Sequence, residues 1–166
     1  MAAKRPGAIL EIGTAVGYSA LLMARVMPEN CRITTVEKYE KRIPVARENF
    51  RLAGEEDRIT LLEGDAGEIL DRLRGETFDF VFMDAAKGQY LGWLPKIMEL
   101  MPAGAVLVSD NVLQDGDIVQ SRFAVDRRNR TIHSRMREYL YELKHNRALE
   151  TSILPVGDGV AISVRV

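Results

Sequence analysis

The chain has 166 residues, of which 46% are hydrophobic and 28% charged, and its formal net charge at pH 7 is −1. This length and composition are typical of one globular domain that is large enough to bury a core. The near-zero charge excludes a whole-molecule field that attracts nucleic acid or an anionic membrane, so any basic site must be local.

Short apolar runs alternate with longer helical segments along most of the chain. We expect five strands, at residues 8–13, 32–37, 58–64, 78–84 and 105–111. Helices are expected between and after them, at residues 18–27, 39–53, 66–73, 90–101 and, mainly, 121–147. Two further strands, 151–156 and 159–166, read as a hairpin joined by Gly157, Asp158 and Gly159.

This alternation of strands and helices predicts a Rossmann-like α/β fold, with a mostly parallel seven-stranded sheet and helices on both faces. The C-terminal hairpin supplies an antiparallel addition at one edge. No repeat, low-complexity segment or linker interrupts residues 1–166, so we expect a single domain. In such sheets ligands bind at the carboxyl ends of the strands, where Gly13, Glu37, Gly64, Asp65, Asp84 and Asp110 are expected.

A single cysteine, Cys31, excludes an internal disulfide framework and is expected to be a small core or loop residue. The N-terminus has no signal-like segment, and no apolar run reaches the length needed to cross a bilayer. We therefore expect a cytoplasmic protein.

The turn after the first strand has features of a nucleoside site. Gly13 and Gly17 would let the backbone approach a ligand and present helix N-terminal amides to it. Their G-x-x-x-G spacing differs from that of a dinucleotide site, which disfavours a nicotinamide dehydrogenase. Glu37 can accept hydrogen bonds from both ribose hydroxyls, and Glu11 is expected to be a buried carboxylate beside the loop. Gly64, Asp65 and Ala66 are candidates for contact with an adenine edge.

Three oxygen-bearing side chains follow the fourth and fifth strands. Asp84 ends one strand, and Asp110 and Asn111 end the next; neighbouring strands are about 4.8 Å apart, so these side chains can converge on one ion. Oxygen ligands favour Mg²⁺, with Mn²⁺ or Ca²⁺ as alternatives, over zinc or copper. A hydroxyl bound to such an ion has a lowered pKa, and Lys87 would stabilise the resulting oxyanion or accept the proton. We expect both histidines, His133 and His145, at the surface.

A metal ion with two open neighbouring coordination sites favours a substrate with two vicinal oxygens, such as a catechol or 5-hydroxyuridine. Residues 121–137 contain six arginines and one acid, Asp126. Arginines beside an active site are typical of contacts with a phosphate backbone, although a solvated, salt-bridged helix face is the alternative. The candidates for such phosphate contacts are Arg122, Arg127, Arg128 and Arg130.

The stretch "ILEIGTAVGYSALLMA" closely resembles the first motif of the cation-dependent class I S-adenosylmethionine (SAM) O-methyltransferases, which include the catechol and caffeoyl-CoA enzymes. The resemblance covers essentially the whole chain from residue 8. It implies that Lys87 is the general base and that Asp84, Asp110 and Asn111 bind the metal. It further implies a cofactor site formed by Glu11, Gly13, Thr14, Gly17, Ser19, Glu37, Gly64, Asp65, Ala66 and Asp84, with Gly13, Thr14 and Ser19 at the methionine part.

Three later stretches, "FMDAAKGQY", "SDNVL" and "LPVGDGVAIS", look most like the bacterial tRNA 5-hydroxyuridine methyltransferases, which form 5-methoxyuridine. This resemblance implies Mg²⁺-dependent methylation of tRNA, with the four arginines named above as candidates for tRNA binding. The alternatives are the same chemistry on a small catechol-like phenol, and a non-catalytic SAM- or RNA-binding module. The family usually carries helices before the first strand, where this chain has only "MAAKRPG", so we expect lid helices to be missing or supplied by a partner subunit. Resemblance also suggests a homodimer.

Overall fold

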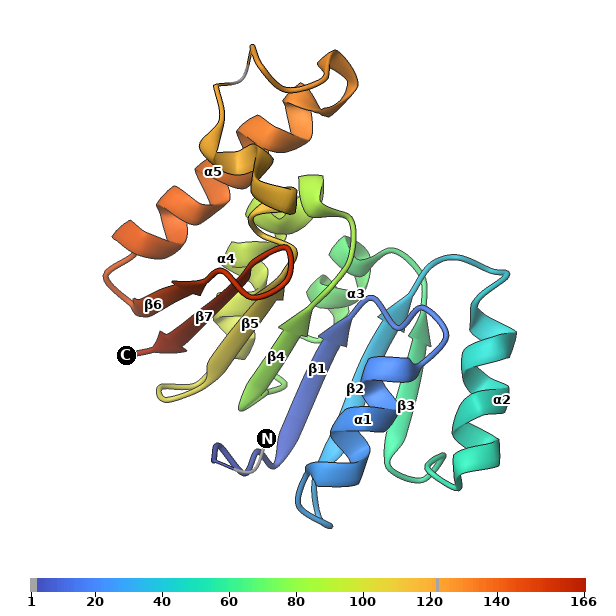
Figure 1. Cartoon of the computed structure of the whole chain (residues 1–166). Helices are drawn as coiled ribbons and strands as arrows, with labels where there is room; N and C mark the ends of the chain where they lie inside the picture. The colour runs from blue at the N-terminus through green and yellow to red at the C-terminus, as the bar shows by residue number, and fades with distance from the viewer. Residues whose placement is uncertain (1–2, 122) are drawn as a thin grey trace.

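The computed structural model describes residues 3–121 and 123–166 and has a central sheet with helices on both faces (Figure 1). Its seven strands are β1 (Ala8–Ile12), β2 (Arg32–Glu37), β3 (Ile59–Glu63), β4 (Phe80–Met83), β5 (Val106–Asp110), β6 (Leu149–Leu154) and β7 (Val160–Arg165). They lie in the order β3-β2-β1-β4-β5-β7-β6. The first five are parallel, and β7 pairs antiparallel with both β5 and β6. The expected Rossmann-like class and the hairpin are confirmed.

Five α-helices form the outer layers: α1 (Tyr18–Val26), α2 (Ile43–Ala53), α3 (Ala66–Arg72), α4 (Tyr90–Leu100) and α5 (Arg130–His145). Figure 1 shows α1 and α2 on one face of the sheet and α3, α4 and α5 on the other. Each layer buries its own apolar cluster against the sheet, because each helix has an apolar stripe on its inner side. The described residues also form three short 3₁₀ turns: η1 (Lys87–Gln89), η2 (Gln114–Val119) and η3 (Arg127–Asn129).

Two helices are shorter than their sequence patterns predict. The helix expected from residue 39 begins at Ile43, because the Glu37 carboxylate accepts the backbone N–H groups of Lys38 and Tyr39 and holds that segment in a turn. The helix expected from residue 121 begins at Arg130. The guanidinium of Arg130 donates hydrogen bonds to the carbonyl oxygens of Phe123 and Val125, and these bonds hold the preceding segment as a loop.

The strand β5 shows that the two faces of the sheet differ. Leu107 and Ser109 are fully buried toward α4 and α5, whereas Val106 and Val108, which point to the other face, are partly exposed. On that second face the buried cluster is formed mainly by β1, β2 and β3 with α1 and α2. At β5, therefore, the face beneath α4 and α5 is closed, whereas the opposite face is only partly covered.

Cys31 is buried, as expected of a small core residue. The prediction of two surface histidines is wrong for His133, which is buried, and confirmed for His145, which is exposed. His133 shares the inner stripe of α5 with Met136, Tyr139 and Leu143, and that helical spacing carries it into the core. Among residues 3–121 and 123–166, none of the helices has both the length and the apolar character that crossing a bilayer requires.

Candidate active site

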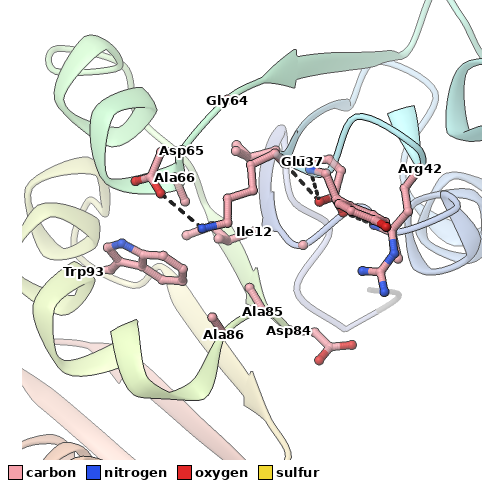
Figure 2. Close-up of a pocket in the computed structure, with 15 residues that line it drawn as sticks. Ile12, Glu37, Arg42, Gly64, Asp65, Ala66, Asp84, Ala85, Ala86 and Trp93 are labelled. Carbon is pink, nitrogen blue, oxygen red and sulfur yellow. Dashed lines mark hydrogen bonds and ion pairs between the residues drawn. The ribbon is translucent and has the colours of Figure 1, made fainter. Parts of the chain in front are cut away.

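A pocket of about 400 Å³ lies at the carboxyl ends of four adjacent strands, β3, β2, β1 and β4 (Figure 2). The chain proceeds from β1 outward to β3 and then returns to place β4 on the other side of β1. This reversal of strand order is where doubly wound sheets bind ligands. The sequence-predicted residues that line the pocket are Gly13, Glu37, Gly64, Asp65, Ala66 and Asp84.

Glu37 is buried at the end of β2 and organises this part of the pocket. Its Oε2 accepts the N–H of Ala15 at 2.8 Å, and its Oε1 accepts those of Lys38 and Tyr39 at 3.0 and 2.9 Å. A carboxylate has about four acceptor positions, so three are used to hold the two loops together. Glu37 also lines the pocket, so its fourth acceptor position suits a hydroxyl group of a ligand.

The two glycines of the first turn have different tasks. Gly13 lines the pocket with φ +109°, and a Cβ there would collide with the carbonyl group of Asp84 on the neighbouring strand. Gly17 has φ +87°, and a Cβ there would collide with the ring of Phe50 from α2. The first glycine thus lets β1 and β4 meet closely beside the ligand pocket, and the second lets α1 pack on α2.

Glu11, Thr14 and Ser19 form a hydrogen-bonded cluster behind the pocket lining. Glu11 is fully buried and accepts hydrogen bonds from the hydroxyls of Ser19 and Thr35, each at 2.5 Å. The Thr14 hydroxyl lies 2.6 Å from that of Thr35. Burial raises the pKa of Glu11 to about 7, although both hydrogen bonds oppose the shift. The negative charge of Asp84 adds a smaller increase in the same direction.

The far end of the pocket is formed by the start of α3 and the inner side of α4. Asp65 caps α3 by accepting the N–H of Gly67 at 2.8 Å, and its other oxygen lies 3.5 Å from the ammonium of Lys38. The indole of Trp93 borders the same space (Figure 2). A flat apolar surface beside an exposed carboxylate is a suitable environment for a nucleobase with an amino group.

A second cluster adjoins the pocket at the end of β4. The Lys87 ammonium lies 2.9 Å from Asp84 Oδ1, 2.5 Å from Asn111 Oδ1 and 3.1 Å from the Tyr90 hydroxyl. Asp84 also lines the pocket, so the pocket and the Lys87 cluster share this carboxylate. The expected meeting of the fourth and fifth strand ends is therefore present, with the lysine between them.

Asn111 is held in place from the C-terminal hairpin. It has φ +56°, and its side-chain Nδ2 donates to Asp158 Oδ2 at 2.5 Å. Asp110 Oδ1 accepts the N–H of Asn111 at 2.8 Å. The bond to Asp158 fixes which end of the Asn111 amide faces the site, so its oxygen points to Lys87.

The oxygen atoms of Asp84, Asp110 and Asn111 are partly suited to bind a divalent metal ion. The oxygens of Asp84 and Asn111 already converge on one cationic atom, the Lys87 nitrogen, and Asp110 adjoins them at the end of the next strand. Carboxylate and amide oxygens are suitable ligands for Mg²⁺. No group of three or more His, Cys, Asp and Glu side chains is placed to hold a metal within the described residues. Asp84, Asp110 and Asn111 would instead supply two carboxylates and one amide.

The predicted tRNA-binding arginines have unequal surroundings. Arg127 and Arg128 are exposed on η3, where Arg128 lies 3.7 Å from Asp126. Arg130 binds the carbonyl oxygens of the preceding loop and stacks over the ring of Phe123. Arg122 lies outside the described residues.

A family model described as O-methyltransferase matches residues 1–166. The chain belongs to this O-methyltransferase family. Caffeoyl-CoA O-methyltransferase 1 of Eucalyptus globulus is 34% identical over 95% of this chain and 66% of its own length. A catechol O-methyltransferase of Niastella koreensis is 38% identical over 67% of this chain and 52% of its own. The chain thus spans about two thirds or less of these two relatives.

Solved structures of O-methyltransferases share the fold. A Bacillus cereus O-methyltransferase in complex with SAH has a TM-score of 0.88 and 27% identity, with 99% of this chain and 76% of that chain covered. The O-methyltransferase TomG from Streptomyces achromogenes, in complex with SAM, also has a TM-score of 0.88, with 26% identity and coverage of 99% and 75%. Cofactor-bound members of the family therefore have the same arrangement of strands and helices.

Several residues of this site carry no clear sequence signal. Trp93 belongs to an apolar helical pattern that is typical of a core residue, and Tyr39 and Arg42 lie in a segment that reads as helix. Asp158 reads only as part of a hairpin turn. Contacts between segments distant in sequence bring these side chains to the site, so local patterns do not reveal them.

Proposed function

We propose that this chain catalyses Mg²⁺-dependent transfer of a methyl group from SAM to a hydroxyl oxygen. The observation that carries the proposal is the position of Asp84, which belongs both to the nucleoside-sized pocket and to the cluster of Lys87 and Asn111. One carboxylate thereby connects a cofactor pocket with a group that can handle an acceptor proton.

The pocket residues would bind the cofactor by its chemical parts. The free acceptor capacity of Glu37 suits a ribose hydroxyl, and Asp65 and Trp93 border a space that suits the adenine ring. Asp84, together with Glu11 when it is ionised, places negative charge near the other end, where a cationic sulfonium and ammonium would be attracted. SAM itself would supply an electrophilic methyl group.

The Lys87 cluster would handle the acceptor. A divalent ion held by Asp84, Asp110 and Asn111 would acidify the acceptor hydroxyl. Lys87 would stabilise the resulting oxyanion as an ammonium, or receive the proton if it is present as a neutral amine, since its nitrogen lies within hydrogen-bond distance of two of these side chains. Alignment of the acceptor oxygen beside the cofactor pocket would supply much of the acceleration.

We propose 5-hydroxyuridine in tRNA as the acceptor, because its O4 and 5-hydroxyl are vicinal. The exposed Arg127 and Arg128 support this choice, since they extend from the segment that follows β5 and offer phosphate contacts. Arg130 contributes indirectly by fixing the loop before it. A small catechol is the second candidate, favoured by the similarity to the Niastella koreensis enzyme.

Nucleoside mass spectrometry tests the proposal. Undermodified tRNA is incubated with the protein, SAM and Mg²⁺, and 5-methoxyuridine is expected to form only when Mg²⁺ is present. Lys87→Met is expected to reduce the rate about 100-fold or more, because a positioned acid–base group contributes about 10²–10⁴-fold. Charge reversal at Arg127 and Arg128 should raise the KM for tRNA and leave transfer to a catechol unchanged.

Rapid turnover of a catechol with no methylation of tRNA would reject the tRNA acceptor and support the small phenol. Tight binding of S-adenosylhomocysteine with no Mg²⁺-dependent transfer to either acceptor would instead indicate a non-catalytic module. Undiminished activity of both Asp84→Ala and Asp110→Ala would eliminate the metal mechanism.

A further inference from the structure

The hydroxyl of Tyr90 lies beneath the turn that carries Asp84 and Lys87. Tyr90 is fully buried at the first position of α4, and its hydroxyl donates to the carbonyl oxygen of Met83 at 2.9 Å. The same oxygen accepts the N–H of Ala85 at 3.2 Å and the Lys87 ammonium at 3.1 Å. The carbonyl oxygen of Asp110, at 3.4 Å, is a second and longer contact for the same hydroxyl hydrogen. The shorter bond to Met83 and the two incoming N–H groups together use the one donor and both acceptor positions, which restricts the orientation of the hydroxyl.

The Lys87 ammonium is equally well matched. It has three N–H donors and three oxygen partners, from Asp84, Asn111 and Tyr90. Of these three partners, Asp84 and Asn111 are also expected to bind the metal ion. Tyr90 is held by its buried ring and by its hydrogen bond to Met83. It can therefore keep its hydrogen bond to the Lys87 ammonium when Asp84 and Asn111 bind the metal ion.

Tyr139 provides an internal comparison. Its ring packs edge-on against that of Tyr90, with centroids 5.5 Å apart, and it is equally buried. Its hydroxyl, however, lies 2.5 Å from that of Ser109 on β5. Burial raises the pKa of both tyrosines, so both hydroxyls stay protonated at neutral pH. The two residues share ring, burial and charge state and differ in what the hydroxyl contacts.

We infer that Tyr90 is a positioning residue for methyl transfer, whose hydroxyl holds the Lys87 ammonium and the Ala85 backbone in the geometry that the acceptor requires. This inference rests on the proposed function, in which Lys87 handles the acceptor proton. A phenyl ring would fill the same space, so the role belongs to the oxygen atom rather than to packing.

The first test compares Tyr90→Phe with the matched control Tyr139→Phe. Displacement of a reacting group by about 1 Å can cost up to about 100-fold in rate, so we expect Tyr90→Phe to lower kcat about tenfold. The KM for SAM and the Kd for S-adenosylhomocysteine should stay within about twofold, because the residue acts on the acceptor side. Tyr139→Phe should keep kcat within about twofold. Equal losses of kcat in the two variants would overturn the inference.

A double-mutant cycle tests whether Tyr90 acts through Lys87. In a Lys87→Met background, Tyr90→Phe is expected to change the residual rate less than about twofold, because the group it positions is gone. A further tenfold loss in that background would show a separate structural effect and overturn the inference.

Nitrogen-15 NMR of the lysine ammonium groups supplies a readout without turnover. The Lys87 signal, assigned by its loss in Lys87→Met, should show slowed proton exchange in the wild type and in Tyr139→Phe, and faster exchange in Tyr90→Phe. Identical exchange in all three would overturn the inference. A wild-type protein that transfers no methyl group but shows this pattern would contradict the proposed function and leave the positioning of Lys87 supported.

Discussion

At the scale of single residues, Glu11 is a carboxyl group whose pKa lies well above its ordinary value because of burial. It is fully buried on β1, bonded to two hydroxyls, and close enough to Asp84 for that charge to raise its pKa further. With a pKa of about 7, the acid and carboxylate forms are present in similar amounts near neutral pH, and an approaching cation favours the carboxylate. The residue is therefore suited to respond to a positively charged ligand in the adjacent pocket.

The raised pKa of Glu11 makes a prediction about stability. Because its pKa is about 7 in the folded chain and 4.5 as the reference value, the folded state binds more protons between these values. The free energy of unfolding should then fall as pH rises from about 4.5 to 7, by up to about 3 kcal/mol. Urea denaturation at pH 5 and pH 8 measures this loss. In Glu11→Gln the decline should be smaller by that amount, and parallel curves for the two proteins would contradict the prediction.

At the scale of elements, the turn between β6 and β7 supports the site from a distance in sequence. Asp158 orients the Asn111 amide, and backbone N–H groups of Val112 and Leu113 donate to the carbonyl oxygens of Gly159 and Asp158. Gly159, with φ +92°, has no room for a Cβ beside Leu113. The hairpin turn and the loop after β5 thus form one unit.

This unit predicts the effect of Asp158→Ala. Loss of the carboxylate frees the Asn111 amide to turn, so its oxygen no longer always faces Lys87. We expect methyl transfer to slow about tenfold, with the Kd for S-adenosylhomocysteine within about twofold, since the cofactor pocket is unaffected. Steady-state kinetics and calorimetry measure both quantities. Glu150→Ala, at an exposed position of β6, is the control and should behave as wild type.

The sequence predicts elements better than it predicts their contacts. The strand positions follow from apolar runs bounded by turn residues, and Asp84, Lys87 and Asn111 meet because parallel strand ends share an edge. The bond between Asn111 and Asp158 depends instead on how a hairpin inserts beside β5, which no local pattern encodes. The sequence prediction of a surface position for His133 is wrong for a similar reason. The residue lies on the buried side of α5 with Met136, Tyr139 and Leu143, and that side can be identified only when the helix is known to begin at Arg130.

At the scale of the whole molecule, the two faces of the sheet differ in how far they are closed. Leu107 is fully buried beneath α4 and α5, whereas the next residue, Val108, is partly exposed on the opposite face. Leu107→Ala is therefore expected to lower the free energy of unfolding by about 2–5 kcal/mol. Val108→Ala removes less buried surface and should cost about 1 kcal/mol. Urea denaturation of this adjacent pair measures the difference, and equal costs would contradict the asymmetry.

The order of strands also has a consequence for how the chain folds. β6 precedes β7 in sequence but joins the sheet only through it, because β7 pairs with both β5 and β6. The edge of β5 therefore stays open until residue 165 is available, and β6 has no partner before that moment. During synthesis, a chain that has reached only residue 154 would leave β6 and the outer edge of β5 unpaired, a state in which association with other chains competes with folding.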